Sequence, residues 1–295
     1  MENNKQKKNV ILRILTSRFF WLLVVLFIAF GCVLSAVIKH SQEEIEKARS
    51  TYSGLSKTGG YPFSTKVEEG LYIDEYSFGS YEDDQYTSRR GIDVSVYQGD
   101  IDWARVKEAG VEFAMIRLGF TGNDSGEMFL DEYFEANVLG ATEAGIDVGV
   151  YYFSQARNVD EAIAEAQFVC RNLVGKKITM PVAFDMEPLS GTESDRIHGL
   201  KMLDVTEIAD AFCEVVDKHG YESILYGNPS WIFYHYNLSH LTHRKLWMAH
   251  YTYMSGLSGF PYEYAMWQYS DMGIVDGIEG YVDLDIQFIK KDENH

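Results

Sequence analysis

Two acidic side chains stand two residues apart at the end of an otherwise apolar run. The run is MPVAFDME at 180–187, and its acids are Asp185 and Glu187. Residues i and i+2 of a β-strand point to the same side, about 6.5–7 Å apart, so both carboxyls would face one cleft. A single Asp at a strand end is better explained as a helix cap or a loop residue. Two charges on a buried strand cost several kcal/mol each unless they are paired or used, so we interpret this pair as functional.

Other acids fall in other apolar runs. Asp93 lies in IDVSVY at 92–97, and Asp283 and Asp285 lie in VDLDIQF at 282–288. Acids that converge on one cleft raise at least one pKa, because like charges disfavour joint ionisation. A glycosidase needs this condition, with one carboxyl protonated to donate to the leaving oxygen and another ionised to stabilise positive charge. A divalent metal could also use such acids, but no HExxH motif or Asp/Gly calcium loop accompanies them, so we expect no metal and no cofactor.

Aromatic side chains near the predicted strand ends favour a sugar ligand. The chain has 20 Tyr and five Trp. Ring faces can stack on the apolar faces of pyranose rings, and hydroxyls and amides can hydrogen-bond to sugar oxygens. One such ring alone is more often a core residue, but a group around one cleft mouth carries more weight. The predicted substrate-binding residues are Tyr151, Tyr226, Trp247, Tyr251, Trp267 and Gln268.

Short apolar runs alternate with amphipathic stretches from residue 91 onward, which indicates βαβ units and a mainly parallel sheet. Eight strand candidates in roughly 200 residues predict an α/β fold, a β/α barrel of the TIM type. The helical patterns are clear after the first four strands and weak after the later ones, so we expect an irregular barrel. A doubly wound open sheet is the alternative, but no GxGxxG motif follows any strand.

An uncharged apolar segment precedes these units. Residues 19–38 read FFWLLVVLFIAFGCVLSAVI, and such a helix reaches roughly 30 Å, the thickness of a hydrocarbon core. The basic residues within 1–18 predict a cytoplasmic N-terminus and a single pass through the cell membrane, with an extracellular catalytic domain. A cleaved signal peptide and a lipoprotein processed at Cys32 are the alternatives, and both also export the domain that follows.

The rest of the chain is strongly acidic. Residues 41–295 carry 20 basic and 43 acidic side chains, a formal charge of −23, which argues against a nucleic-acid partner. Residues 39–89 lack a sustained period and predict a stalk or linker, and residues 90–295 form the expected catalytic barrel. Cys170 and Cys213 fall in helical segments, where two buried free thiols are a simpler explanation than a disulfide.

Several motifs follow one another in order along the chain. They are GIDVSVYQGDIDWARVKEAGVEFAMIRLGF at 91–120, AGIDVGVYYFSQA at 144–156, PVAFDMEP at 181–188, LYGN at 225–228, LWMAHY at 246–251, and WQYS followed by VDGIEGYVDLD within 267–285. Together they resemble glycoside hydrolase family 25, the lysozyme-like muramidases with an irregular β/α barrel. The resemblance covers about 91–289, and an ordered series of this kind is far more specific than the paired acids alone.

This resemblance implies cleavage of the β-1,4 bond between N-acetylmuramic acid and N-acetylglucosamine, with peptidoglycan glycan strands as the partner. It implies that Glu187 donates a proton to the glycosidic oxygen and that Asp185 orients the substrate's N-acetyl group. Asp93 and Asp283 would complete the acidic floor. A substrate-assisted route and an inverting route are both compatible with the resemblance. The family usually has Asn where this chain has Asp285, and an inward-pointing Asp285 would raise the pKa of neighbouring carboxyls.

Two other functions are alternatives to a membrane-anchored muramidase. One is an inactive module that binds the cell wall and keeps the cleft without turnover. The other is a scaffold of an envelope machine in which hydrolysis is secondary. All four expected acids are present, which argues against an inactive module.

Overall fold

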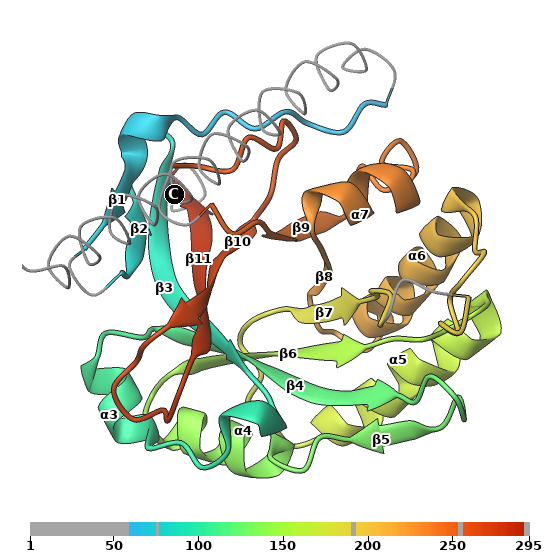
Figure 1. The fold of residues 1–295 in the computed structure, drawn as a ribbon, viewed down its shortest axis with the longest axis horizontal. Coiled ribbons are helices and arrows are strands. Elements are labelled where there is room, and N and C mark those ends of the chain that lie inside the picture. The colour runs from blue at the N-terminus through green and yellow to red at the C-terminus, as the bar shows by residue number, and fades with distance from the viewer. Residues whose placement is uncertain (1–58, 75–76, 190–192, 253–255, 292–295) are drawn as a thin grey trace, which may run out of the picture. The chain divides into compact units, whose positions relative to one another are not determined.

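The computed structural model describes residues 59–74, 77–189, 193–252 and 256–291, in which eight strands close into a β/α barrel (Figure 1). The barrel strands are β3 (Tyr86–Val94), β4 (Phe113–Thr121), β6 (Asp147–Phe153), β7 (Val182–Asp185), β8 (Ser223–Gly227), β9 (Lys245–Ala249), β10 (Met266–Gly273) and β11 (Val282–Lys290). Outside the barrel lie β1 (Leu71–Ile73), β2 (Gly79–Tyr81) and β5 (Met128–Leu130). Closure follows because β3 pairs with β11 on one side and with β4 on the other. The predicted strands and the α/β barrel architecture are therefore confirmed.

The barrel is irregular at its last strand. The strands β3, β4 and β6 to β10 run parallel to one another, whereas β11 is antiparallel to both of its neighbours, β10 and β3. A parallel return needs a crossover of a dozen or more residues, usually a helix, and only residues 274–281 separate β10 from β11. The chain therefore turns back directly, and the first residues of β11 lie beside the last residues of β3.

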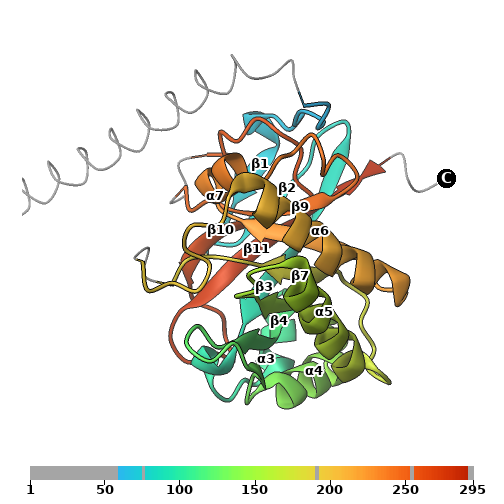
Figure 2. The ribbon, with the colours of Figure 1, turned by 90° about the vertical axis from the view of Figure 1, so that its right-hand side faces the viewer.

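Helices follow the earlier strands and cover the outer face of the sheet. They are α3 (Trp103–Glu108), α4 (Phe134–Glu143), α5 (Val159–Leu173), α6 (Met202–Lys218) and α7 (Pro229–His235), with 3-10 turns η1 (Glu68–Gly70) and η2 (Val96–Gln98). Figure 2 shows α4, α5 and α6 along one flank of the barrel. The sequence sets where they begin: Asn158 accepts the backbone N–H of Glu161 in the first turn of α5, and Asn228 accepts that of Trp231 in α7.

The barrel strands are buried on both faces, which explains their continuous apolar sequences. Side chains of one parity fill the lumen, among them Phe113, Met115, Ile224 and Trp247, and those of the other parity pack beneath the helices. Gly91 allows β3 to approach β4, because a Cβ there would lie 2.1 Å from the ring of Phe113. The lumen is a packed core, so a site can form only at its ends.

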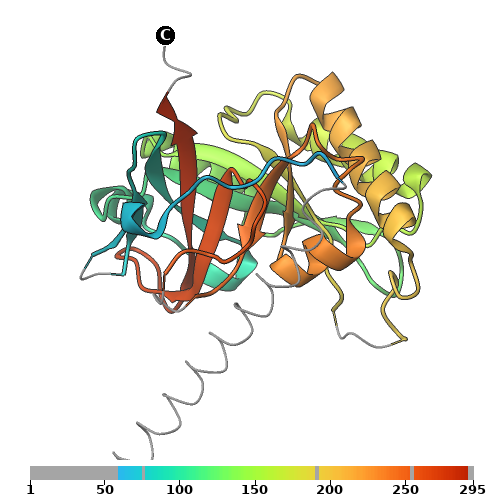
Figure 3. The same cartoon turned by 90° about the horizontal axis from the view of Figure 1, so that it is seen from above.

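Residues 59–74 and 77–85 belong to the barrel domain and residues 86–89 to strand β3, whereas the sequence predicted a linker up to residue 89. Figure 3 shows this blue and teal segment running across the orange and red strands of the C-terminal half. The backbone N–H of Gly79 donates to the hydroxyl of Tyr269 at 2.7 Å, and Tyr81 packs edge-on against Phe288. The segment covers the outer face of β10 and β11 in place of a helix. Its order comes from these tertiary contacts, which a search for periodicity does not detect.

Residues 1–58 hold the predicted cytoplasmic segment, transmembrane helix and Cys32, and they lie outside the described residues. Within the ranges that are described, no helix is both long enough and apolar enough to cross a bilayer. Cys170 and Cys213 are free, buried thiols, which confirms the simpler of the two predictions for them.

Candidate active site

Four acids meet at the carboxyl end of the barrel. Asp93 lies near the end of β3, Asp185 ends β7, and Glu187 follows two residues later. Asp283 comes from the start of the antiparallel β11 and lies directly opposite Asp93 in the ladder. Burial raises the pKa of both Asp185 and Asp283, and repulsion from Asp93 raises each further. The structure therefore brings together the acids that the sequence singled out.

Asp185 and Glu187 lie two residues apart at the end of β7, one buried and the other partly exposed. Asp185 is 6% exposed, and its Oδ1 has no hydrogen-bond partner in the part of the chain that is described. Glu187 is partly exposed. Burial raises the pKa of both carboxyls, and repulsion from Glu187 raises that of Asp185 further. Such acids titrate as a unit, so the pair keeps one proton at a pH at which isolated carboxyls have lost theirs.

Arg117 brings a positive charge to this acidic site. Its Nε donates to Oδ2 of Asp131 at 2.7 Å, and its guanidinium lies 5.0 Å from the centre of the Tyr97 ring. The charge of Arg117 lowers the pKa of Asp185, against the effect of burial. This residue was missed in the sequence, although a single cation within the apolar run at 113–120 was an available signal.

Asp93 is held in place by Gln268. The Nε2 of Gln268 donates to Oδ2 of Asp93 at 2.7 Å, and its Oε1 accepts the hydroxyls of Tyr226 and Tyr251, both at 2.9 Å. Burial raises the pKa of both phenols, so they are neutral donors, and two donors fix which way the amide points. These three predicted substrate-binding residues thus form a network that orients one of the acids.

The rim of the site carries Asp283 and Tyr151, which are both partly exposed. Burial, with repulsion from Asp93 and Asp271, raises the pKa of Asp283 to about 8. Asp283 is therefore protonated at neutral pH and can donate a hydrogen bond. Burial also raises the pKa of the Tyr151 phenol, which keeps it neutral.

Two of the predicted sugar-binding rings are almost completely buried, and for them the prediction is wrong. Trp247 and Trp267 are each 1% exposed. Trp247 lies in the lumen, where its Nε1 donates to Oδ1 of the fully buried Asp285 at 2.8 Å. Trp267 points to the outer face because its neighbour Gln268 points inward, and its Nε1 donates to the carbonyl of His250 at 2.9 Å.

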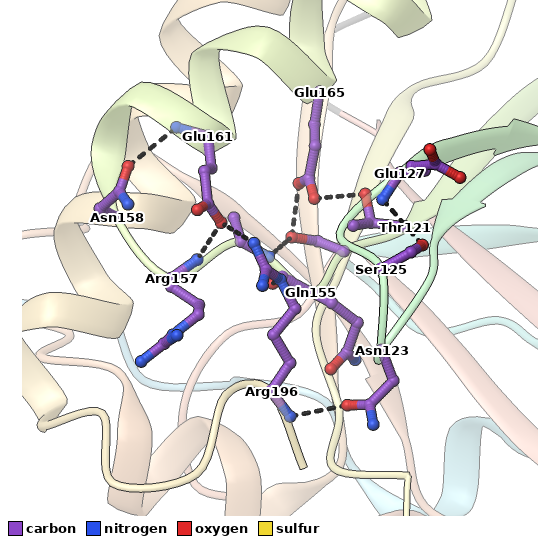
Figure 4. Close-up of polar contacts among 12 residues, drawn as sticks. Thr121, Asn123, Ser125, Glu127, Gln155, Arg157, Asn158, Glu161, Glu165 and Arg196 are labelled. Carbon is purple, nitrogen blue, oxygen red and sulfur yellow. Dashed lines mark hydrogen bonds and ion pairs between the residues drawn. The ribbon is translucent and has the colours of Figure 1, made fainter.

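The loop that carries Glu187 is tied to two neighbouring loops. The Nε2 of Gln155, just beyond β6, donates to the carbonyl oxygen of Glu187 at 3.1 Å. The Nε of Arg196 donates to the carbonyl of Gln155 at 3.0 Å, and its Nη2 donates to Glu161 at 2.9 Å (Figure 4). The backbone N–H of Arg196 donates to Oδ1 of Asn123 at 2.6 Å. No sequence signal identified these residues, because their contacts exist only once the loops are brought together.

Beside these loops, Glu165 is a buried acid that joins α5 to the sheet. The hydroxyls of Thr121 and Ser154 donate to its two carboxyl oxygens, each at 2.6 Å (Figure 4). Burial raises the pKa of Glu165 to about 7. The contact fixes the ends of β4 and β6 relative to the helix, and so supports the loops above them.

Comparison with known proteins identifies relatives of this barrel. A family model described as glycosyl hydrolases family 25 matches residues 92–278. "Lysozyme M1" of Streptomyces globisporus is 30% identical over 233 residues, which is 74% of this chain and 74% of the relative. A family 25 glycosyl hydrolase from Bacillus anthracis has a TM-score of 0.56 and 26% identity, over 72% of this chain and 94% of that structure. A bacterial lysozyme from Streptomyces coelicolor has a TM-score of 0.53 and 27% identity, over 67% of this chain and 90% of that structure.

Proposed function

This chain belongs to glycosyl hydrolases family 25 and hydrolyses peptidoglycan as a muramidase, and we propose that Glu187 and Asp185 perform the chemistry. The single observation that carries this assignment is the pair of neighbouring carboxyls, Asp185 and Glu187, at the end of β7. One of its carboxyls is partly exposed, and the other is buried with an oxygen that has no partner within the described residues. The bond that the enzyme cleaves is the β-1,4 linkage between N-acetylmuramic acid and N-acetylglucosamine.

Glu187 is the proton donor to the glycosidic oxygen. It is the more exposed member of the pair, and burial raises its pKa, which is the direction that a general acid needs. Transfer of the proton to the leaving oxygen breaks the bond to the next sugar while positive charge develops at the anomeric carbon. The carboxylate that remains on Glu187 then takes a proton from the water that completes hydrolysis.

Asp185 accepts the N–H of the substrate's N-acetyl group. The acetamido oxygen attacks the anomeric carbon, and the cyclic intermediate carries positive charge that an ionised Asp185 stabilises. The unpartnered Oδ1 of Asp185 and the charge of Arg117 both suit this role. An N–H donated to Asp185 favours its ionised form, which leaves the proton of the pair on Glu187.

Asp93 and Asp283 complete the floor and rim of the cleft. Asp93 is fixed by Gln268, and Asp283 is protonated at neutral pH because its pKa is raised to about 8. Burial raises the pKa of Asp93 as well, so both acids can donate as well as accept hydrogen bonds to sugar hydroxyls. Tyr151 and Tyr251, both partly exposed, add neutral phenols at the same mouth.

The same proposal places the catalytic domain outside the cell, tethered by residues 19–38. The support is the uncharged run of 20 apolar residues preceded by the basic segment 1–18. Intact mass of the protein from the membrane fraction tests this: a complete N-terminus supports the tether, and a chain that begins at Cys32 or later contradicts it.

Zymography on purified peptidoglycan tests the catalytic assignment. Wild-type protein should clear the substrate, and Glu187→Gln should not, while it still folds and still sediments with peptidoglycan. Binding without clearing by either protein would instead indicate a wall-binding module. Clearing by both proteins would show that Glu187 is not the acid.

A further inference from the structure

We propose that the ring of Tyr97 is the platform of an outer sugar-binding subsite, which takes a further N-acetylglucosamine unit of the glycan strand outside the cleaved pair. The inference rests on the proposed function, because that function sets which polymer extends from the acidic site. Tyr97 is 82% exposed, the largest fraction for any large hydrophobic residue in the described ranges. A single exposed ring is ordinary on a protein surface, so its exposure alone indicates no function.

The strand pairing places Tyr97 beside the acids. Asp93 and Asp283 lie opposite each other in the antiparallel ladder of β3 and β11. Beyond Asp93 the chain continues past the end of β3 into the turn η2, which carries Tyr97. The Nε2 of Gln98 donates to the carbonyl of Tyr281 at 3.4 Å, and this contact joins η2 to the loop before β11. Tyr281 is 59% exposed, so two phenols stand on adjoining loops next to the acids.

Hydrogen bonds fix the backbone that carries Tyr97. The hydroxyl of Ser95 accepts the backbone N–H of Tyr97 at 3.3 Å, and the Oε1 of Gln98 accepts that of Ser95 at 2.8 Å. The Oδ2 of the buried Asp131 accepts the backbone N–H of Val96 at 3.0 Å. A ring on such a turn loses little further freedom when a ligand stacks on it, so the entropic cost of ordering it is small.

Arg117 supports the ring of Tyr97. Its guanidinium carbon lies 5.0 Å from the ring centre, and its Nε donates to Oδ2 of Asp131 at 2.7 Å. One carboxyl oxygen therefore holds both the turn and the cation over which the ring lies. Because the residue is still 82% exposed, most of the ring remains open to a ligand. The apolar face of a pyranose ring can stack there while its hydroxyls stay in water.

The charge around Tyr97 favours an uncharged sugar. Next to η2, a pocket of about 530 Å³ lies between the same two loops, and its lining includes Asp100, Asp102, Asp276 and Glu279. Its cation, Arg105, is paired with Asp276, and Arg117 is paired with Asp131. An acidic surface of this kind repels carboxylates. N-acetylglucosamine is neutral, whereas N-acetylmuramic acid carries a lactyl carboxylate or a peptide, so the subsite should take the former.

Equilibrium binding of soluble glycan strands to the whole chain carrying Glu187→Gln tests the subsite. This background should bind the strands without cleaving them, and the strands are peptidoglycan chains freed of their peptides by an amidase. Addition of Tyr97→Ala should raise Kd by about 3-fold to 10-fold, the range for one stacked ring. Tyr97→Phe keeps the ring and should stay within about twofold. Tyr72→Ala is the matched control, since Tyr72 on β1 is also a surface tyrosine, 64% exposed.

The binding series has three outcomes that would overturn the subsite. The first is a Kd in Tyr97→Ala equal to that in Tyr72→Ala. The second is an equal rise in Tyr97→Phe and Tyr97→Ala, because the effect would then belong to the hydroxyl and not to the ring. The third is the absence of any strand binding by Glu187→Gln.

Steady-state kinetics of the active protein give a second readout. Tyr97→Ala should raise KM for long glycan strands by a factor similar to that in Kd and leave kcat within about twofold, because the ring lies outside the cleaved pair. A fall in kcat with an unchanged KM would contradict an outer binding site.

Failure of the subsite and failure of the proposed function are distinguishable. If wild-type protein clears peptidoglycan and Tyr97→Ala binds strands normally, the subsite is wrong and the function stands. If wild-type protein releases no reducing sugar but Tyr97→Ala binds strands more weakly than Tyr72→Ala, the catalytic assignment is wrong and the subsite stands.

Discussion

Gln155 donates a hydrogen bond to the carbonyl oxygen of Glu187 at 3.1 Å, which joins the end of β6 to the loop that carries the proposed acid. Arg196 binds the carbonyl of that same Gln155, so the acid is held through two successive contacts. Loops at the carboxyl end of a β/α barrel carry its chemistry, and their precision depends on such contacts. The position of Glu187 is therefore a property of three loops rather than of one strand.

Removal of the Arg196 side chain should misplace Glu187. Arg196→Met loses the contacts to Gln155 and Glu161, and we expect kcat to fall by about 10-fold to 100-fold with a smaller change in KM, because the acid is displaced. Steady-state kinetics on solubilised glycan strands measure this split. Arg157→Met is the control, since Arg157 is exposed and its side chain points away from the cluster in Figure 4. Equal kcat values in Arg196→Met and Arg157→Met would show that Arg196 does not position Glu187.

The charge of Arg117 should set the acid limb of the pH profile. It lowers the pKa of Asp185, so its loss lets Asp185 hold a proton to higher pH. In Arg117→Gln the acid limb of kcat/KM should move to higher pH, whereas Arg117→Lys, which keeps the charge, should stay closer to wild type. An acid limb that is unchanged in Arg117→Gln would show that Asp185 does not need to ionise.

The proposed role of Asp185 depends on the substrate's N-acetyl group. Asp185→Asn should reduce kcat by about two to four orders of magnitude, because the amide cannot stabilise the charge of the cyclic intermediate. The kcat of wild-type protein should fall by a comparable factor on glycan strands whose muramic acid has been de-N-acetylated. Near-normal turnover of that deacetylated substrate would exclude assistance by the N-acetyl group and favour the inverting route.

The segment before the barrel should contribute to stability through Lys66. The side chain of Lys66 is fully buried, pairs with Glu263, and lies over the rings of Tyr86, Tyr264 and Phe288. Lys66→Met leaves Glu263 without its cation, and we expect a loss of about 2 kcal/mol, less than for a fully buried pair because Glu263 is 26% exposed. Urea unfolding measures it.

The matched control for Lys66 is Lys245→Met. Lys245 pairs with Glu222 on the surface, where both side chains are more than half exposed. Such pairs contribute about 0–1 kcal/mol. A Lys66→Met variant no less stable than Lys245→Met would show that the segment is not anchored by this residue.

The sequence predicted the barrel well because its strands are buried on both faces and therefore appear as apolar runs. The site acids could be predicted because they lie in or at the ends of those apolar runs. Residues 59–89 were predicted less well, because order there depends on contacts such as that of Gly79 with Tyr269, which are 190 residues apart. A pattern search within a short window cannot detect such a partner.

The two tryptophans show a second limit of the sequence. Trp267 precedes Gln268, and adjacent residues of a strand face opposite sides, so only one of them can reach the lumen. Trp247 does face the lumen, but it is buried there against Asp285, a contact that depends on the register between strands. Arg117 was not predicted as a site residue. Its role depends on its charge acting on Asp185, which only the fold brings near from β7.

The most direct test of the central claim is the identity of the reducing sugar that the protein releases from peptidoglycan. Digests reduced with borohydride and then hydrolysed should contain muramicitol from wild-type protein and no increase over background from Glu187→Gln. Release of glucosaminitol, or undiminished release of muramicitol by Glu187→Gln, would contradict a muramidase in which Glu187 protonates the departing sugar.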